Sequence, residues 1–500
     1  MFNIIKLNEK DNIGIAPMDI PQNININYGI RSIDNIPYGH KISLKKIKSG
    51  DFIFKYGQII GISNKNIEPG EHVHSHNMGY SEFKREYIRK DIRNDINKSE
   101  KTEYFKGFKR NNGSSGTRNY IGLISTDNCS ATVVKKISDK INNYLKDNTF
   151  ENIDGAVCLK HSSGCGMNTS GYAMNVFNRT IEGFKIHPNF GKVFVIGLGC
   201  ECAQISLYNN DQEKRNIEYL NIQDEGGTNE IITKVTSKII NQLNEINSIS
   251  RTNIPISELT VALQCGGSDS YSGITANPAL GFASDMIIDH GGTTLLSETP
   301  EIYGAEHLLF EKSLNEKNIE KLNKQIEWWK KYVASNDSTL DNNPSPGNKK
   351  GGLTTILEKS LGAVSKAGNR NMVDVLDYAE QVKTKGFNFM NSPGYDPVSV
   401  TGQVASGANV ICFTTGRGSC FGFKPTPSIK IATNTNMYNK LSEDMDINAG
   451  TIMDNVASVN EVGKEIFDKI ISVASGEKSK SEINDYGDDE FNPWIIGATL

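Results

Sequence analysis

The first 78 residues alternate short runs of β-forming side chains with turn signals. DFIFKYGQIIGI at 51–62 is one such run, and PYGH at 37–40 and EPGE at 68–71 mark turns. No segment of useful length here spaces its apolar residues as a helix does. The pattern predicts a small all-β domain over residues 1–78.

The next segment, residues 79–104, is dense in both charge signs and poor in apolar residues. Such a composition is typical of a solvated surface, because nothing in it supplies a hydrophobic face to bury. We expect an exposed linker or a solvated helix.

From residue 105 onward, short apolar runs are followed by polar, glycine-rich turns and then by helical patterns. Examples of the runs are IGLIST at 121–126, VFVIG at 193–197, LTVALQ at 259–264 and ANVICF at 408–413. Buried strands that alternate with helices predict parallel βαβ units, whose ligands bind at the carboxyl ends of the strands. A break within NEINSISRTNIPISE at 244–258 divides the region into two Rossmann-like α/β domains, 105–252 and 253–500.

Composition and charge narrow the class of protein. Lys and Arg number 54 against 58 Asp and Glu, and 37% of the residues are hydrophobic, which argues against disorder and against a nucleic-acid partner. The longest apolar runs are far shorter than the ~18 residues that a membrane span needs. The chain also starts without an apolar signal core, so we expect a cytoplasmic protein with no membrane partner.

The eight cysteines include no Cys-x-x-Cys pair, so a disulfide framework is not expected. Several of the cysteines stand in glycine-rich turns, and Cys129, Cys165, Cys200 and Cys265 are together numerous enough to hold an iron–sulfur cluster. The alternative is that each is a small buried hydrophobic residue.

Two segments combine polar groups of the kind that bind metals. QCGGSDSYSGITANPALG at 264–281 carries Cys265, Ser268, Asp269 and Asn277, and SETPEIYGAEH at 297–307 carries Glu298 and Glu301. We predict one divalent cation on Cys265, Asp269, Glu298 and Glu301, because carboxylate oxygens suit Mg, Mn or Fe(II). Acidic residues that merely favour a helix N-terminus are the alternative for the two glutamates.

Other candidates for the site are basic. TTGRGS at 414–419 surrounds Arg417 with hydroxyls, a pattern that suits bidentate binding of a carboxylate by the arginine. His72, His74 and His76 alternate at the end of the β domain and would project from one face of a strand. His161 with Cys165 in KHSSGCG resembles half of a metal site, or else a turn held by a hydrogen-bonded histidine.

Taken together, the motifs of the chain resemble those of the altronate/galactarate dehydratase family. They are HVHSHN, GTRNYIGLISTDNCSATV, HSSGCG, GLGCE, QCGGSDSYSGITANPALG, LSETPEIYGAEH, DNNPSPGNKKGGLTTILEKSLGA, SPGYDP, TGQVASGANVICFTTGRGS and DMDINAG. The resemblance implies an N-terminal β-clip domain of the SAF type, α/β domains behind it, and an iron- or manganese-dependent removal of water from a sugar acid. DNNPSPGN and NSPGYDPVSVTGQ resemble the altronate branch, which implies D-altronate as the substrate and galactarate as the alternative.

Dehydration of a 2,3-dihydroxy acid needs a base for the C2 proton and an acid for the departing C3 hydroxyl. We assign Lys359 as the base, provided that burial and the metal lower its pKa, and a histidine from His74, His76 or His161 as the acid. The β domain would close over the site and exclude water.

Substrate binding is assigned to Arg417 on the C1 carboxylate, with further contacts from Thr414, Thr415, Asn277 and Ser268. The product would be 2-dehydro-3-deoxy-D-gluconate. We expect a homodimer with a small sugar acid as its ligand. A non-catalytic sugar-acid sensor is the alternative from another functional class.

Overall fold

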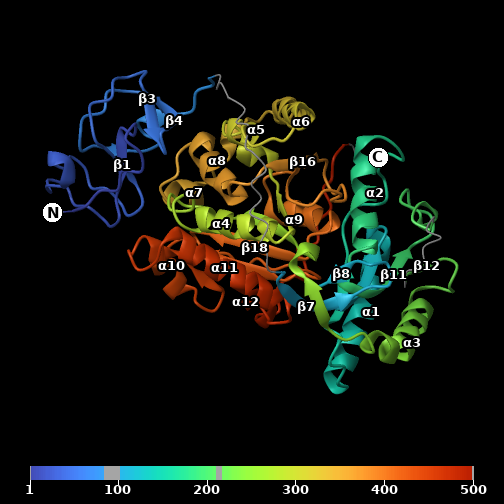
Figure 1. The fold of residues 1–500 in the computed structure, drawn as a ribbon. Coiled ribbons are helices and arrows are strands. Elements are labelled where there is room, and N and C mark those ends of the chain that lie inside the picture. Colours follow the sequence, from blue (N-terminus) through green and yellow to red (C-terminus); the bar gives the residue numbers. More distant parts are fainter. Residues whose placement is uncertain (1, 84–101, 210–216, 498–500) are drawn as a thin grey trace.

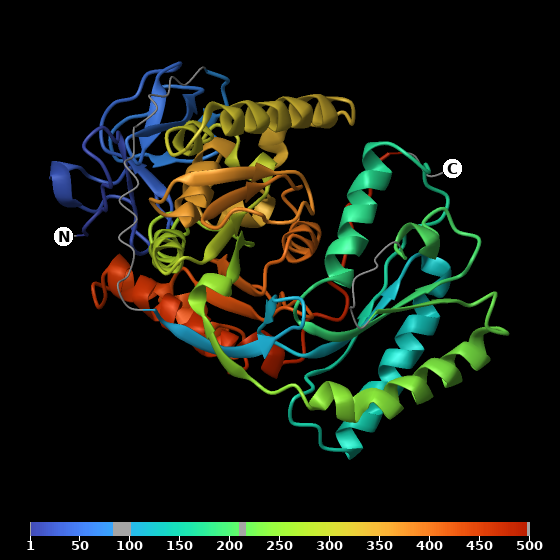
Figure 2. The same ribbon diagram turned by 45° about the vertical axis from the view of Figure 1, so that its right-hand side comes forward.

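The computed structural model describes residues 2–83, 102–209 and 217–497. A β unit and a smaller α/β unit flank a larger α/β unit on opposite sides (Figures 1 and 2). The predicted linker spans residues 79–104, and most of it, residues 84–101, lies outside the described residues. No helix in the described part of the chain is both long and apolar enough to cross a membrane.

The N-terminal unit consists of two three-stranded antiparallel sheets. One has the order β1 (Ile13–Ile15), β2 (Lys41–Ser43), β5 (His72–Val73), and the other has the order β3 (Phe52–Lys55), β4 (Gln58–Ser63), β6 (Met78–Gly79). Isoleucines such as Ile13, Ile42, Ile53 and Ile60 fill its interior. β-Branched side chains pack well on the pleated surface of short strands, and the prediction of a small all-β unit is confirmed.

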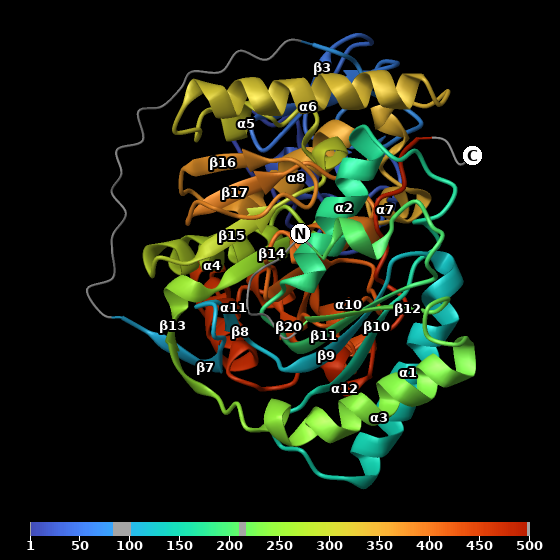
Figure 3. The ribbon, with the colours of Figure 1, turned by 90° about the vertical axis from the view of Figure 1, so that its right-hand side faces the viewer.

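The second unit is a four-stranded parallel sheet of order β10 (Gly155–Leu159), β9 (Tyr120–Ser125), β11 (Phe190–Gly197), β12 (Ile217–Asn221). Helices α1 (Asn128–Asp147) and α3 (Thr228–Asn247) cover one face and α2 (Tyr172–Lys185) the other (Figure 3). Both faces of the sheet are therefore buried, which explains why its strands read as continuous apolar runs.

A small antiparallel sheet joins the two ends of this unit. Its strands are β13 (Thr252–Pro255), β7 (Tyr104–Lys109) and β8 (Ser115–Gly116), in that order. The pairing of β13 with β7 holds the entry and the exit of the chain side by side.

The third unit is built on a seven-stranded parallel sheet. Its order is β16 (Met372–Leu376), β17 (Phe387–Met390), β15 (Thr293–Leu296), β14 (Thr260–Cys265), β18 (Val410–Thr415), β19 (Ser428–Ala432), β20 (Ile447–Asn448). The longer helices are α4 (Ala276–Asp289), α6 (Glu316–Ala334), α8 (Ile356–Val364), α9 (Asp396–Ala405) and α11 (Val459–Ala474). The shorter ones are α5 (His307–Phe310), α7 (Pro346–Lys350), α10 (Thr435–Lys440) and α12 (Lys480–Ile483).

The strand order of this sheet reverses at β14. The chain proceeds from β14 to β15 on one side and later returns to β18 on the other side. In open α/β sheets, the loops that diverge at such a reversal leave a crevice where ligands bind. The turns after β14, β15 and β18 are the polar segments that the sequence singles out.

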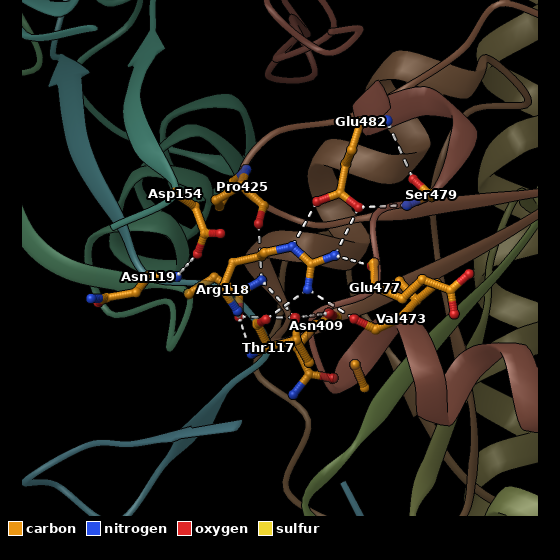
Figure 4. A network of polar contacts seen from close by, with 12 residues as sticks. Thr117, Arg118, Asn119, Asp154, Asn409, Pro425, Val473, Glu477, Ser479 and Glu482 are labelled. Atoms are coloured by element: carbon orange, nitrogen blue, oxygen red, sulfur yellow. Dashed lines mark hydrogen bonds and ion pairs between the residues drawn. The ribbon is translucent and has the colours of Figure 1, made fainter. Parts of the chain in front are cut away.

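A fully buried arginine fastens the second unit to the third (Figure 4). The Arg118 guanidinium donates to both carboxylate oxygens of Glu482, at 2.6 and 2.7 Å, and to the carbonyl oxygens of Val473 and Glu477. A planar guanidinium that donates two hydrogen bonds to one carboxylate fixes the relative orientation of the two groups as well as the distance between them. The two α/β units are thus held in one defined arrangement.

Candidate active site

Three potential metal ligands meet at the carboxyl edge of the seven-stranded sheet. Cys265 is the last residue of β14, and Glu298 and Glu301 follow the neighbouring strand β15. The Cys265 sulfur and one carboxylate oxygen of each glutamate all lie within 4.8 Å of one another, and all three side chains are buried. Adjacent parallel strands end at the same edge, which is why residues more than 30 positions apart converge here.

Glu298 is held in an unusual backbone conformation. Its φ of 77° and ψ of 69° lie in the left-handed region, which costs a non-glycine residue roughly 1–3 kcal/mol. Its backbone N–H donates to Ser392 Oγ at 3.0 Å. Both carboxylate oxygens of Glu298 are buried without a hydrogen-bond partner within the described structure. A buried carboxylate left in this state is costly, so the donor set fits a bound cation.

Two lysines lie against this group. Lys366 Nζ is 2.9 Å from Cys265 Sγ, and Lys359 Nζ is 2.6 Å from Glu301 Oε1 and 2.7 Å from Asn343 Oδ1. The lysines are seven positions apart, on α8 and on the 3₁₀ turn that follows it. Two helical turns separate them, so both ammonium groups reach the same side.

Burial and these charges set the protonation of the site. Burial, opposed by Lys366, raises the pKa of Cys265 to about 11. Burial and the neighbouring Glu301 raise the pKa of Glu298. For Glu301 burial acts in the same direction, but the ion pair with Lys359 outweighs it and lowers the pKa. Without a cation, the site therefore holds Glu301 ionised and favours neutral Cys265 and Glu298.

A cavity of about 430 Å³ opens beside the group. Its lining includes Cys265, Gly266, Gly267, Glu301, Asn343, Asn348, Lys359 and Asp396. Pockets of this size are typical of small-molecule sites.

Asp396, the first residue of α9, is part of this lining. Its carboxylate lies so close to Gly266 that a Cβ at residue 266 would stand 2.4 Å from Asp396 Oδ2. Burial, followed by the charge of Glu301, raises the pKa of Asp396 to about 7. A carboxyl group with that pKa can both accept and release a proton near neutrality.

Asp269 does not join the potential ligands. Its carboxylate accepts hydrogen bonds from the hydroxyls of Ser272 and Thr433 and from the side-chain amide of Asn434. These contacts tie the turn after β14 to the turn after β19. The expectation of a fourth ligand at this position is not met in the structure, because local and long-range donors already occupy the carboxylate.

The residues assigned to substrate binding divide into two groups. Thr414 donates to Asn277 Oδ1 at 2.6 Å, and Thr415 Oγ1 accepts from the backbone N–H of Gly418, so these side chains bond to other protein groups. Arg417 has an exposed side chain that lies against Gly267 and Gly351 near the cavity lining.

The remaining two of these residues brace the same region. Asn277 Nδ2 donates to the carbonyl oxygen of Gly362, and the Ser268 carbonyl accepts from Asn348 Nδ2 at 2.8 Å. Asn348 lines the cavity, so Ser268 acts on the site through its backbone.

The predicted histidines do not line the cavity. His161 lies in the second unit, where the Ser125 carbonyl and the Ser163 N–H contact its two ring nitrogens. His74 packs against His40 and His72, and His76 is exposed. Burial lowers the pKa of His74 to about 3 and that of His161 to about 4, so both rings are neutral near neutrality and neither is the imidazolium that a general acid requires.

The pKa of Lys359 moves opposite to the direction required of a base. Burial alone would lower it, but the adjacent Glu301 carboxylate outweighs burial and raises it. Lys359 is therefore an ammonium group at the wall of the cavity.

The β unit is already seated on the third unit. Lys41 and Lys55 each donate to Glu358 at 2.8 Å, and all three side chains are fully buried. Glu358 also accepts from Thr354. This contact is next to Lys359, so the β unit positions the helix that carries both site lysines.

Sequence reasoning missed Asp396, Lys366 and Asn343. Lys366 could have been found from its spacing of two turns after Lys359. Asp396 stands in the PGYDP motif, but nothing local indicates that this carboxylate lies beside Gly266 in the cavity lining.

Family models match each of the three units. The family "D-galactarate/Altronate dehydratase, C-terminal" matches residues 256–499, "D-galactarate dehydratase/Altronate hydrolase, second domain" matches 107–247, and "Altronate/galactarate dehydratase SAF domain" matches 2–81.

Individual relatives cover nearly the whole chain. An altronate dehydratase of Bacillus subtilis is 36% identical over 499 residues, covering 97% of this chain and 98% of the relative. An altronate dehydratase of Escherichia coli is 34% identical, over 96% and 97%. A galactarate dehydratase (L-threo-forming) of Escherichia coli is 36% identical, over 95% and 93%. The chain therefore belongs to the altronate/galactarate dehydratase family and is an enzyme of the hydro-lyase class.

Proposed function

We propose that the enzyme dehydrates D-altronate to 2-dehydro-3-deoxy-D-gluconate at the cavity beside Cys265, Glu298 and Glu301. The observation that carries the proposal is this group of three potential ligands, with two lysines against it and an open cavity next to it. Removal of the C2 proton beside the substrate carboxylate builds up negative charge on the substrate. The two lysines and a bound cation would place positive charge next to it.

We propose Fe(II) as the bound ion, with Mn(II) as the second candidate. A set of one sulfur and several carboxylate oxygens is softer than the all-oxygen sets that Mg prefers. When bound, the cation would stabilise the charge that develops at the substrate carboxylate as C2 is deprotonated.

Two side chains in the cavity lining are suited to the proton transfers. Asp396, with its pKa of about 7, is proposed to accept the C2 proton. Lys359 is protonated and held by Glu301 and Asn343, and it is proposed to donate a proton to the C3 hydroxyl, which leaves as water. The resulting enol then tautomerises to the 2-keto product. Lys359 is thus proposed as the acid and not as the base predicted from the sequence, because Glu301 stabilises its charged form.

Arg417 is proposed to hold the C1 carboxylate. Its side chain is exposed, and the absence of side chains at Gly267 and Gly351 leaves it room beside the cavity lining. The planar guanidinium matches both oxygens of a carboxylate.

Galactarate is the alternative substrate, since a galactarate dehydratase is as similar in identity as the altronate dehydratases. Steady-state turnover of both acids, measured with Fe(II) under reducing conditions, separates the two. Higher kcat/KM for D-altronate supports the proposal, and equal or higher kcat/KM for galactarate contradicts it. Binding of either acid without product would indicate a sugar-acid sensor instead.

A further inference from the structure

Three exposed cysteines lie at the carboxyl edge of the sheet in the second unit, away from the cavity described above. Cys129 follows β9, Cys165 follows β10 and Cys200 follows β11. These three strands are neighbours in one parallel sheet, with β9 in the middle (Figure 3). The turns that carry the cysteines therefore lie at one edge.

Direct hydrogen bonds hold the three turns together. The backbone N–H of Asn128 donates to the Ser163 carbonyl at 3.1 Å, which joins the first turn to the second. The N–H of Ala203 donates to the Gly164 carbonyl at 3.0 Å, which joins the third turn to the second. Each of these four backbone groups belongs to a residue within three positions of Cys129, Cys165 or Cys200.

The close approach of these turns requires glycine. Gly164 has a φ of +95°, and a Cβ at this position would stand 2.0 Å from the carbonyl oxygen of Thr126. Only a residue without a side chain lets the Cys165 turn settle against the turn that precedes Cys129. Gly164 thus lets the turn that carries Cys165 lie directly against the chain that leads into Cys129.

Each of the three cysteines is exposed on a turn that contacts another cysteine-bearing turn. Cys200 Sγ also accepts from Gln223 Nε2 at 3.5 Å. The three cysteines therefore belong to one patch at this edge of the sheet.

The three sulfurs do not form a set as tight as a single ion requires. A tetrahedral zinc ion with Zn–S bonds of ~2.3 Å needs thiolates about 3.8 Å apart. Among the described residues, Cys265, Glu298 and Glu301 are the group whose ligand atoms all lie within 4.8 Å, and the three cysteines do not meet that limit. An inorganic cluster spans a wider gap, because each thiolate binds a different iron atom.

We propose that Cys129, Cys165 and Cys200 hold an iron–sulfur cluster at this edge of the second unit. Each thiol releases a proton as its sulfur binds iron, and the iron and sulfide come from outside the chain. Three protein thiolates leave one iron of a four-iron cluster open to an oxygen ligand. Cys265 is not the fourth ligand, since it lies in the third unit among Lys366 and Glu301.

The test is anaerobic reconstitution of the full chain with iron and sulfide. The readouts are visible absorbance and the amounts of bound iron and acid-labile sulfide. Cys129→Ser, Cys165→Ser, Cys200→Ser and the triple variant are compared with the wild type. Cys420→Ser is the matched control, because Cys420 is also exposed but lies in the third unit, and Cys265→Ser reports on the catalytic site. Thermal unfolding of each unreconstituted variant checks that it is folded.

We expect visible absorbance and acid-labile sulfide in the wild type, Cys420→Ser and Cys265→Ser, with a matching amount of iron beyond any single ion bound at the catalytic site. Each of the other three single variants should lose the absorbance and the sulfide, down to the level of the triple variant. The proposal is overturned if the triple variant keeps the wild-type sulfide and absorbance, or if the reconstituted wild type holds no acid-labile sulfide. Because the three positions are read separately, one misfolded variant leaves two others to decide.

Discussion

Lys366 Nζ lies 2.9 Å from Cys265 Sγ, and both side chains are buried. An ammonium group in this position favours the thiolate, which is the form of cysteine that binds a metal. The lysine thereby offsets part of the effect of burial, which raises the pKa of the Cys265 thiol. We therefore propose Lys366 as a positioning residue for the proposed cation rather than a group that touches substrate.

Replacing Lys366 by Met tests this role. Loss of the charge should weaken binding of Fe(II) or Mn(II) by about 10–100-fold, the usual cost of removing a group that supports a metal ligand. Calorimetric titration with each ion measures the change. Lys464→Met, on the exposed face of α11, is the control and should bind the ion as the wild type does. Unchanged affinity for both ions in Lys366→Met would show that Lys366 does not support metal binding.

Glu358→Gln should loosen the β unit. The substitution leaves Lys41 and Lys55 buried with one anionic partner fewer, and breaking a buried ion pair costs about 3–5 kcal/mol. Thermal unfolding should show the loss, and Glu316→Gln on α6 provides an exposed control. An unchanged unfolding midpoint would mean that the triad contributes nothing to docking.

The same triad predicts a pH dependence of stability. Burial opposes ionisation of Glu358, but Lys41 and Lys55 outweigh it and hold the pKa of this carboxyl far below its usual value of 4.5. A lowered folded pKa contributes stability that is complete above the unfolded value and is lost as the pH falls below it. The unfolding free energy should decline in acid, and Glu358→Gln should decline less steeply.

Asp396→Asn should remove the base. Because the base acts in its ionised form, wild-type kcat/KM should rise with pH through an apparent pKa near 7. In the variant, kcat/KM should no longer rise with pH in this range and should be lower by about 10²–10⁴-fold. Asp468→Asn, at an exposed position of α11, should keep the profile of the wild type. If Asp396→Asn kept the wild-type rise of kcat/KM with pH, another residue would be the base.

Arg417→Lys keeps the charge but loses the planar fork. We expect a higher KM and a lower kcat for D-altronate with an unchanged unfolding midpoint, since the side chain is exposed and its removal leaves no buried group unpaired. Steady-state kinetics over a range of substrate concentration provides the measurement. Wild-type kinetics in the lysine variant would exclude Arg417 from carboxylate binding.

The sheets and the edge that carries the site could be predicted from the sequence. Apolar strands with polar turns after them required parallel sheets, and Cys265, Glu298 and Glu301 converge because they end or follow two neighbouring strands. This part of the prediction depended only on local pattern and on the geometry of parallel strands.

Other features depended on partners far away in the chain. Asp269 looks like a ligand in its own segment, yet Thr433 and Asn434 occupy its carboxylate from 164 and 165 positions away. His161 looks like a ligand or an acid, yet a carbonyl 36 positions away holds its ring. Whether a polar side chain is already satisfied is decided by tertiary contacts, which no local pattern records.

The cation proposed on Cys265, Glu298 and Glu301 should support dehydration of D-altronate. The most direct test measures bound metal and D-altronate turnover together, in the metal-stripped chain, in the chain reloaded with Fe(II), and in Cys265→Ser/Glu298→Gln. We predict one ion per chain restored along with turnover in the wild type, and loss of both in the double variant. Full turnover by the metal-stripped chain, or an unchanged ion and rate in the double variant, would contradict the account.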